Sequence, residues 1–168
     1  ETEGLQSLTT RKVAAEIGYS PGTIYNLFED FDALISRVNI RTMQKFNASL
    51  AKVQLTGDAI SDAKEILQVY LDFISMNPSL WASNITHGSR EDIQQPAEFL
   101  QELDKAFQKV EAAIAPLFDA DSKREAWISA RVLWASLQGI VSMPANARII
   151  SEKSMTTKEM AENLVDKY

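Results

Sequence analysis

Apolar residues recur every three or four positions along almost the whole of this 168-residue chain, a spacing typical of amphipathic helices. Runs of alternating β-branched residues, which would indicate strands, do not occur in the sequence. Glycines and prolines interrupt the pattern and mark the ends of the elements. We therefore predict an all-α fold with helices at about 9–17, 21–27, 30–54, 58–76, 79–86, 96–117, 121–143 and 157–168, preceded by a helical stub before residue 5.

The segment 9–28, TTRKVAAEIGYSPGTIYNLF, carries signals for two short helices and a tight turn. Thr9 or Thr10 can cap the first helix, and Gly18 can end it in the left-handed conformation. Ser20 can cap the second helix, with Pro21 at its first position. Two helices joined in this way form a helix-turn-helix, whose second helix enters the DNA major groove. On spacing alone, a surface hairpin without a ligand is an equal alternative.

These two helices should have an inner and an outer face. The apolar positions expected to face inward are Val13, Ala14, Ile17, Ile24, and either Leu27 or Phe28. The outer side of the second helix then carries groups suited to DNA contact. Gly22 permits close approach, Thr23 and Asn26 can hydrogen-bond base edges, and Tyr25 can reach a phosphate oxygen.

Charge adds no support for DNA binding by this segment. The chain has a formal net charge of −6, and residues 1–46 hold five basic residues against six acidic ones. A strongly basic face is the usual electrostatic mark of a nucleic-acid-binding protein. The predicted head is therefore not a basic patch.

Several classes of function find no support in the sequence. Without cysteine, neither disulfides nor thiolate metal sites can form, which fits a reducing cytoplasm. The one histidine, His87, leaves little for metal or triad chemistry, and no nucleophile elbow, phosphate loop or metal-ligand spacing occurs. We expect no enzymatic activity, no metal and no cofactor. We expect His87 to end a short helix before Gly88, with a sensing role as the alternative.

The most apolar stretch is residues 126–143, AWISARVLWASLQGIVSM. It is short for a membrane span, carries Arg131 and Gln138 near its middle and runs into Pro144. We expect a helix buried on nearly all sides within protein, and no membrane association. The sequence starts at Glu1 with neither an initiator Met nor a basic-then-apolar leader. We therefore expect no signal peptide and the loss of an N-terminal piece.

Residues 4–35, GLQSLTTRKVAAEIGYSPGTIYNLFEDFDALI, closely resemble the DNA-binding head of the tetracycline-repressor (TetR) family. The pattern consists of Ala-x-x-x-Gly, a Thr-aliphatic-Tyr triplet, then Phe and a Leu six residues on. The resemblance implies that Arg11 reads a base or phosphate, that Thr10 and Tyr25 hold phosphates, and that the groove is lined by the second helix. The DNA-contacting set that it implies is Thr10, Arg11, Lys12, Ser20, Gly22, Thr23, Tyr25 and Asn26.

The chain departs from the family pattern in two places. The family places a backbone-contacting Lys where this chain has Phe31, so one phosphate anchor is missing unless Lys12 compensates. The family's first helix is largely absent before Gly4. We therefore expect weaker DNA binding and a head that lacks most of its first helix.

The segments 70–84, YLDFISMNPSLWASN, and 133–142, LWASLQGIVS, resemble a TetR subgroup whose C-terminal domain is marked by Trp, His and Gly. Trp134 and Gly139 match, and Gln138 stands at the His position. Aromatic residues of the middle segments, with Gln138 as a polar component, could line an apolar cavity for a small molecule, although a plain core is the alternative. The ligand-binding set is Tyr70, Phe73, Trp81, Phe107, Trp134 and Gln138.

The helix at 121–143 has a second candidate role in dimerisation. Ala135 and Gly139, four residues apart, would let another helix approach closely, and the resemblance assigns such a helix to the dimer interface together with the C-terminal helix. The predicted interface residues are Ala135, Gly139, Ser142 and Leu164. A core formed within one chain is the alternative.

The resemblance implies a head at residues 1–46 and a ligand-binding and dimerisation body at 47–168. The helix 30–54, about 35 Å long, would connect them as a lever. The function that follows is a cytoplasmic, homodimeric repressor that binds a double-stranded DNA operator and is released from it by a small-molecule effector. A DNA-bound scaffold regulated by a protein partner is the alternative, and an enzyme is a distant third.

Overall fold

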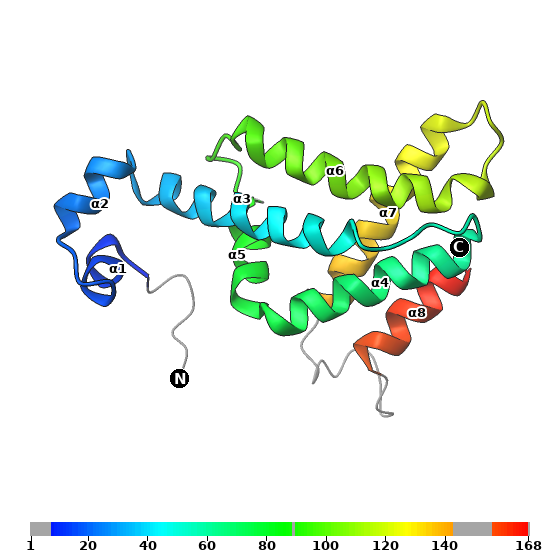
Figure 1. Cartoon of the computed structure of the whole chain (residues 1–168), viewed down its shortest axis with the longest axis horizontal. Helices are drawn as coiled ribbons and strands as arrows, with labels where there is room; N and C mark the ends of the chain where they lie inside the picture. The colour runs from blue at the N-terminus through cyan, green and yellow to red at the C-terminus, as the bar shows by residue number, and fades with distance from the viewer. Residues whose placement is uncertain (1–7, 89, 143–155, 168) are drawn as a thin grey trace. The chain divides into compact units, whose positions relative to one another are not determined.

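The computed structural model of the chain describes residues 8–88, 90–142 and 156–167. Its helices are α1 (Thr10–Glu16), α2 (Pro21–Leu27), α3 (Phe31–Leu50), α4 (Ala59–Met76), α5 (Pro78–Gly88), α6 (Ala97–Ile114), α7 (Lys123–Ser142) and α8 (Thr157–Lys167), with a short 3₁₀ turn, η2 (Ala115–Leu117), after α6 (Figure 1). No residue within the described ranges lies in a strand. The predicted all-α fold is confirmed.

One predicted helix ends earlier than expected. The sequence has no glycine or proline between residues 30 and 54, yet α3 ends at Leu50. The amides of Lys52 and Val53 bond to carbonyls three residues back, on Ser49 and Leu50, at 3.2 and 3.1 Å. These tightened bonds end the helix, so the prediction that it continues to residue 54 is wrong. The predicted stub before residue 5 lies outside the described residues.

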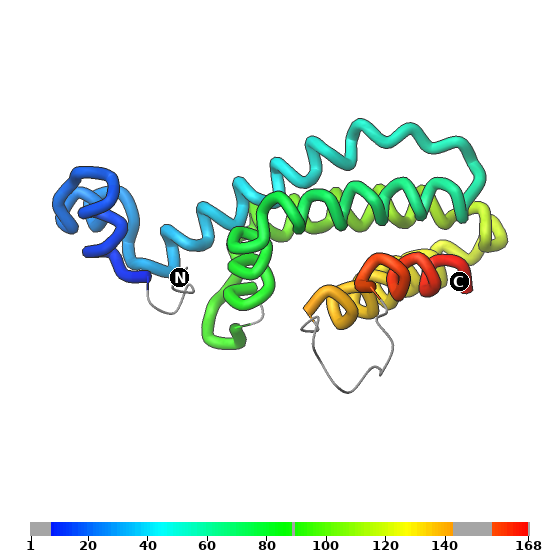
Figure 2. The backbone as a smooth tube through the Cα atoms, turned by 90° about the horizontal axis from the view of Figure 1, so that it is seen from below, coloured from blue at the N-terminus to red at the C-terminus, as the bar shows by residue number. Residues whose placement is uncertain are grey.

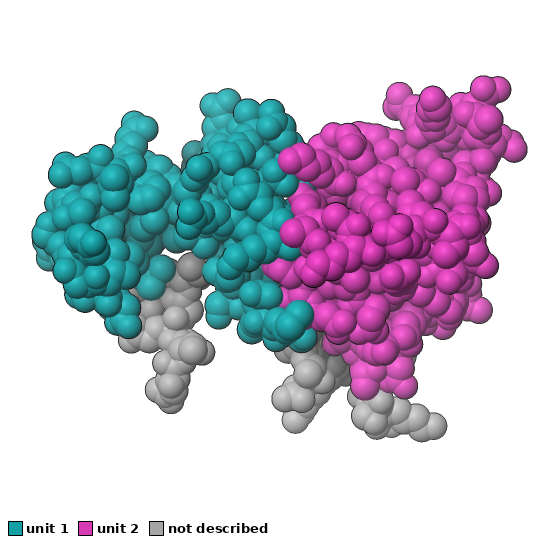
Figure 3. All heavy atoms as spheres, in the orientation of Figure 1, with its two compact units in different colours: residues 1–46, 74–103 teal, residues 47–73, 104–168 magenta. Residues whose placement is uncertain are grey.

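The chain divides into two compact units (Figure 3). Unit 1 comprises residues 1–46 and 74–103, and unit 2 comprises residues 47–73 and 104–168. Three helices, α3, α4 and α6, contribute residues to both units. Unit 1 contains the predicted head together with α5, and the division into a head at 1–46 and a body at 47–168 remains a prediction.

In unit 1, α5 crosses α3 (Figures 1 and 2). The ring of Phe46 on α3 meets that of Trp81 on α5 edge to face, with centroids 5.4 Å apart. Ile40 and Met43 on α3 are also buried. Because apolar side chains of both helices leave water together, this packing stabilises the crossing.

The core of unit 2 contains Ile114 of α6 and Ala130 and Leu133 of α7, which are all buried. Partly buried apolar side chains pack against this cluster: Ala63, Phe107, Val110, Phe118 and Leu164. The helices α7 and α8 lie side by side (Figure 2). Four segments distant in sequence therefore meet in one core, as an all-α domain requires.

Every helix in the part of the chain that the structure describes is too short or too polar to cross a membrane.

Candidate nucleic-acid interface

The end of α1 is a Schellman motif. Thr9 caps the start of the helix, where its hydroxyl accepts a 3.3 Å hydrogen bond from the amide of Lys12. At the other end, Gly18 has a φ of +74°, and the amides of Gly18 and Tyr19 bond to the carbonyls of Ala15 and Ala14 at 3.2 and 2.8 Å. This pair of bonds defines the motif and requires a left-handed residue at Gly18. The predicted turn is therefore confirmed at atomic detail.

The turn leads directly into α2. The hydroxyl of Ser20 accepts the amide of Thr23 at 3.3 Å, and Pro21 occupies the first helical position. The hydroxyls of Ser20 and Thr23 also lie 3.1 Å apart. Because Ser20 satisfies an amide of the first turn, its side chain fixes where α2 begins.

The buried contact between α1 and α2 is small. Ala14 is fully buried and Ile24 is 5% exposed, as predicted. Ile17 was expected to face inward but is 53% exposed, because it is the C-cap residue and has left the helical path. Leu27 is exposed and Phe28 is half-buried, so Phe28 is the inward-facing member of that pair.

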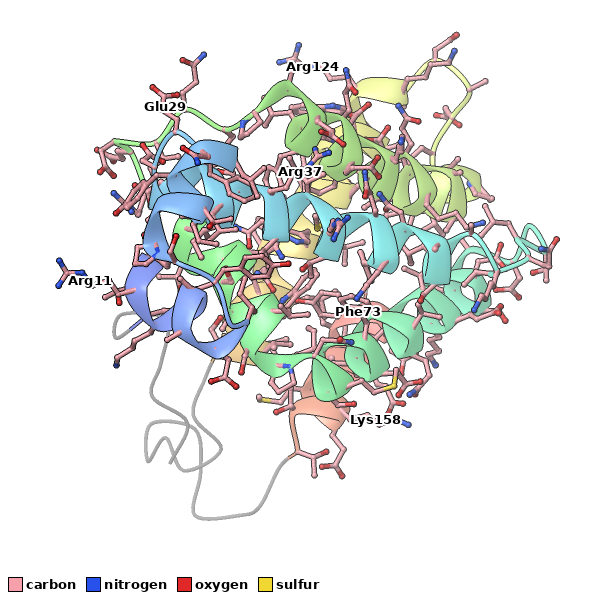
Figure 4. The ribbon with its side chains drawn as sticks, turned by 60° about the vertical axis from the view of Figure 1, so that its left-hand side comes forward. Arg11, Glu29, Arg37, Phe73, Arg124 and Lys158 are labelled. Carbon is pink, nitrogen blue, oxygen red and sulfur yellow. The ribbon has the colours of Figure 1, made fainter. Side chains whose placement is uncertain are left out.

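The predicted DNA-contacting residues lie mostly at the surface of this helix pair. Arg11 and Lys12 are exposed on α1, and Arg11 extends away from the ribbon (Figure 4). On α2, Tyr25 and Asn26 are exposed. Thr10 differs from the rest of the set, because it is only 6% exposed and so cannot present its side chain to a phosphate as the others can.

Gly22 provides a position without a side chain on the outer side of α2. A Cβ added there would lie 3.7 Å from Ser20 Oγ, an ordinary van der Waals contact. The fold itself would therefore tolerate alanine at this position. The bare position is compatible with the prediction that Gly22 permits close approach of DNA.

Acidic residues at the start of α3 serve the fold. Asp30 Oδ1 accepts the amide of Ala33 at 2.7 Å and so caps α3. Asp32 binds Arg90 at 2.9 Å, within the same unit. Their charges are thereby partly engaged in local contacts, which reduces their repulsion of a polyanion. Phe31, which stands at the family's lysine position, begins α3 and is half-buried.

The structure does not gather the predicted ligand-binding set into one unit. Trp81 belongs to unit 1 and packs on Phe46. In unit 2, the Tyr70 hydroxyl donates to Gln138 Oε1 while both side chains are buried. Trp134 is 37% exposed and meets Phe107 edge to face at 5.9 Å. Phe73 is buried in unit 2 (Figure 4), and the role of this set in binding a ligand stays a prediction.

The predicted dimerisation residues of α7 are exposed. Ala135, Gly139 and Ser142 share one face of this helix and are all open to solvent. Ile128 and Val132 extend the same face with exposed fractions of 42% and 51%. The expectation that this helix is buried on nearly all sides is therefore wrong for a single chain. Leu164 instead packs against the core of unit 2.

A polar seam between α3 and α5 was not found from the sequence. Ser83 Oγ donates to Asn39 Oδ1 at 2.8 Å, with both side chains buried. His87 lies in the last turn of α5, as predicted, but it is buried and its Nε2 lies 3.4 Å from Asp32 Oδ1. Polar residues at helical spacing resemble a solvated face, so only the folded arrangement reveals that these are buried.

Nearby, Arg90 bridges two carboxylates of unit 1. It contacts Asp32 at 2.9 Å and Asp92 at 2.6 Å. The hydrogen bond from Arg90 holds the pKa of the Asp92 carboxyl below its ordinary value, because it favours the charged form. Arg90, two residues beyond the end of α5, thus ties the start of α3 to Asp92 in the segment that follows α5.

Comparison with curated proteins finds relatives over part of the chain. The chain is 33% identical over 81 residues to the nucleoid occlusion factor SlmA of Haemophilus influenzae (strain PittGG), which covers 46% of this chain and 36% of the relative. It is 33% identical over 82 residues to the protein of the same name from Haemophilus ducreyi, covering 46% and 39%. The chain therefore spans well under half the length of the curated relatives that it matches.

A second comparison concerns the helices from α4 onward. Residues 63–168 match the family described as "Tetracyclin repressor-like, C-terminal domain", and this match covers more than half of the chain. The finer resemblance to the Trp-His-Gly subgroup stays a prediction. Because this domain match covers residues 63–168 and a helix-turn-helix lies at α1 and α2, the chain belongs to the tetracycline-repressor family.

Proposed function

We propose that this chain is a cytoplasmic transcriptional regulator, not an enzyme, whose α2 reads a DNA operator in the major groove. The observation that carries the proposal is the geometry of α1 and α2, a capped helix, a Schellman turn and a second capped helix. The second helix presents Gly22, Tyr25 and Asn26 outward. These are groups suited to close approach, phosphate contact and base-edge hydrogen bonding.

The finer part of the proposal is a homodimer formed through α7. One face of α7 is open to solvent and combines large apolar groups with small residues. This face consists of Ile128, Val132, Ala135, Gly139 and Ser142. A two-fold symmetric pair of chains would place two α2 helices on a pseudo-palindromic operator. A small-molecule effector would then act by favouring a conformation whose head spacing does not fit the operator.

Selection from a randomised duplex pool tests DNA reading. We expect a palindromic consensus and an affinity that falls with salt, with a slope of about −0.9 per phosphate contacted. Asn26→Ala should relax the choice at particular positions. Asn163→Ala, at an exposed Asn of α8, is the matched control and should leave the consensus unchanged. A pool that yields no consensus at low salt would contradict the proposal.

Gly139→Leu tests the dimer without disturbing the fold. No side chain among the described residues lies within 4 Å of a Cβ added at Gly139, so the chain itself has room for a larger residue. We expect monomers by light scattering and loss of binding to a two-half-site operator. Ala112→Leu, at an exposed position of α6, should remain a dimer. An intact Gly139→Leu dimer would move the interface elsewhere, and a wild-type monomer would favour a scaffold with a different protein partner.

A further inference from the structure

Basic side chains are concentrated on the exposed side of α3. The chain holds 17 basic and 23 acidic residues, yet positions 33–57 hold four of the basic ones and none of the acidic ones. Three of these four lie on α3 within unit 1, at Arg37, Arg41 and Lys45, and all three are exposed. Because residues four apart lie on the same side of a helix, the three form one row, here called the basic stripe. A chain that is acidic as a whole thus presents a row of positive charge along α3.

The basic stripe already binds one carboxylate of the chain itself. Glu98 of α6 reaches α3, where its Oε2 accepts a hydrogen bond from Arg37 Nη1 at 2.5 Å. Its Oε1 accepts a second hydrogen bond, from Gln44 Nε2 at 3.2 Å. Arg37 and Gln44 are seven residues apart, which is about two helical turns. A carboxylate therefore fits against this side of α3 and finds charged and neutral donors there.

The next cation along the basic stripe is open. Arg41 lies about one turn beyond Arg37 and is exposed. Among the described residues, no carboxylate or carbonyl pairs with its guanidinium. A guanidinium presents a planar fork of N–H donors that matches the two oxygens of a carboxylate. Arg41 can therefore receive a carboxylate from another molecule, beside the one that Glu98 supplies to Arg37.

We propose that the basic stripe binds a short acidic segment of a partner protein, with carboxylates at every second residue of an extended chain. The spacing matches, because four residues of a helix rise about 6 Å and two residues of an extended chain span about 6.6 Å. Successive carboxylates of such a segment would face Arg41 and then Lys45, whose ammonium carries three donors. Charge complementarity would fix the register of the segment on α3.

Duplex DNA is the other polyanion that could occupy the basic stripe, and the place of the stripe in the fold favours a protein segment instead. The α1–α2 pair lies at one end of α3, and α3 leads away from it (Figures 1 and 2). At 1.5 Å per residue, Arg41 and Lys45 lie about 15 and 21 Å along the axis from the first residue of α3. A protein segment can occupy this site while α2 reads DNA. The inference therefore goes beyond the proposed function and does not depend on it.

Fluorescence anisotropy of a labelled peptide, titrated with the full chain, tests the inference. The probe is the capped peptide Gly-Glu-Gly-Glu-Gly-Glu-Gly, and its control has Gln in place of each Glu. We expect saturable binding of the Glu peptide that weakens as salt rises, because exposed charges are screened, and no binding of the Gln peptide. In the ¹⁵N spectrum of the chain, the shifts should be confined to α3 around Arg41 and to α6 around Glu98.

Two variants should change the affinity in opposite directions. Arg41→Gln removes a cation of the basic stripe and should weaken peptide binding about threefold to fivefold. Glu98→Gln releases Arg37 and should strengthen binding by a similar factor, a gain that a merely structural role of Glu98 would not produce. Each variant has a control with the same change of charge at an exposed site of unit 2. These controls, Arg124→Gln on α7 and Glu65→Gln on α4, should leave the affinity unchanged.

Absence of saturable binding of the Glu peptide at low salt, or equal affinity in Arg41→Gln and Arg124→Gln, would overturn the inference. It would also be overturned if a random-sequence duplex lost affinity on Arg41→Gln while the Glu peptide did not bind, because the stripe would then be a DNA surface. Thermal unfolding of each variant should match wild type, which separates loss of the site from loss of the fold. A selected operator should bind wild type and Arg41→Gln alike.

Discussion

The α1–α2 pair buries Ala14 and Ile24, whereas unit 2 closes around Ile114, Ala130 and Leu133 with further apolar side chains packed against them. The helices of the two regions also differ in length. α1 and α2 have 7 residues each, and α7 of unit 2 has 20. Helices as short as α1 and α2 have little intrinsic stability. Caps and a glycine turn therefore hold the candidate DNA-reading region, while burial of apolar surface holds unit 2.

Removing apolar volume from the core of unit 2 should have the largest effect. Ile114 is 1% exposed, so Ile114→Ala leaves a cavity and should lower the free energy of unfolding by about 2–5 kcal/mol. Leu117→Ala, at a position 44% exposed, should change it by less than about 0.5 kcal/mol. Urea denaturation followed by circular dichroism measures both. Equal losses in the two variants would contradict the assignment of Ile114 to the core.

The left-handed turn should be the next most sensitive feature. Gly18→Ala forces a Cβ into a residue with φ +74°, at a cost of about 1–2 kcal/mol. No atom of the described residues lies within 4 Å of that Cβ, so the cost comes from the backbone alone. Gly57→Ala, with φ +90° and equally open surroundings, imposes a similar backbone cost in unit 2.

The two glycine variants should differ in their effect on operator binding. Gly18→Ala should weaken operator binding, because α2 must keep its orientation to enter the groove, whereas Gly57→Ala should leave it unchanged. Gel shifts against the selected operator, beside the unfolding curves, measure the difference. Equal operator affinity in both variants would show that the turn does not orient the reading helix.

Loss of the cap of α2 should have a smaller effect. Ser20→Ala removes the acceptor for the Thr23 amide and should destabilise the helix start by about 1 kcal/mol. Hydrogen exchange resolves this locally, because amides of α1 and α2 should exchange faster while those of α7 keep their protection. Ser61→Ala, at an exposed position of α4, should leave both regions unchanged. Uniformly faster exchange after Ser20→Ala would mean that the two regions unfold together.

Local signals made the first region predictable. Thr9, Gly18, Ser20 and Pro21 each act within a few residues, so the sequence predicts 9–17 and 21–27 where the structure has Thr10–Glu16 and Pro21–Leu27. The exposure of Ile17 was missed because helical periodicity treats every apolar residue near a helix end as part of its face. Capping geometry moves the last residue out of that face.

Contacts between distant segments were not predictable from the sequence. Asn39 and Ser83 are 44 positions apart and Tyr70 and Gln138 are 68 apart, and neither pair carries a local mark. The segment that follows α3 is also held by a distant residue, because Lys109 of α6 donates to the Val53 carbonyl at 2.7 Å, 56 positions away. No glycine or proline marks Leu50 itself, and the loop beyond it binds through Thr56 and Gly57 to the nearby Asp62. Tertiary contacts decide these features, where local propensity is a weak guide.

Asp62 provides a pH test of how unit 2 holds this loop. Its carboxylate is buried and accepts the Thr56 amide at 2.9 Å, the Thr56 hydroxyl at 2.8 Å and the Gly57 amide at 3.0 Å. The Thr56 amide, followed by the hydroxyl and the Gly57 amide, lowers the pKa of Asp62, because these donors favour the charged form.

A folded-state pKa below the unfolded one means that the unfolded chain takes up the proton first as pH falls. The contribution of Asp62 to stability is therefore complete above the unfolded pKa, about 3.9, and is lost as pH falls through the folded value. Asp62→Asn should be less stable than wild type at pH 7, because an amide nitrogen replaces one acceptor oxygen, and this difference should narrow between about pH 4 and pH 2. Thermal unfolding across that range, with Asp121→Asn at an exposed site as control, measures it. If the difference in stability between wild type and Asp62→Asn stayed constant down to pH 2, the charge of Asp62 would not be what holds the loop.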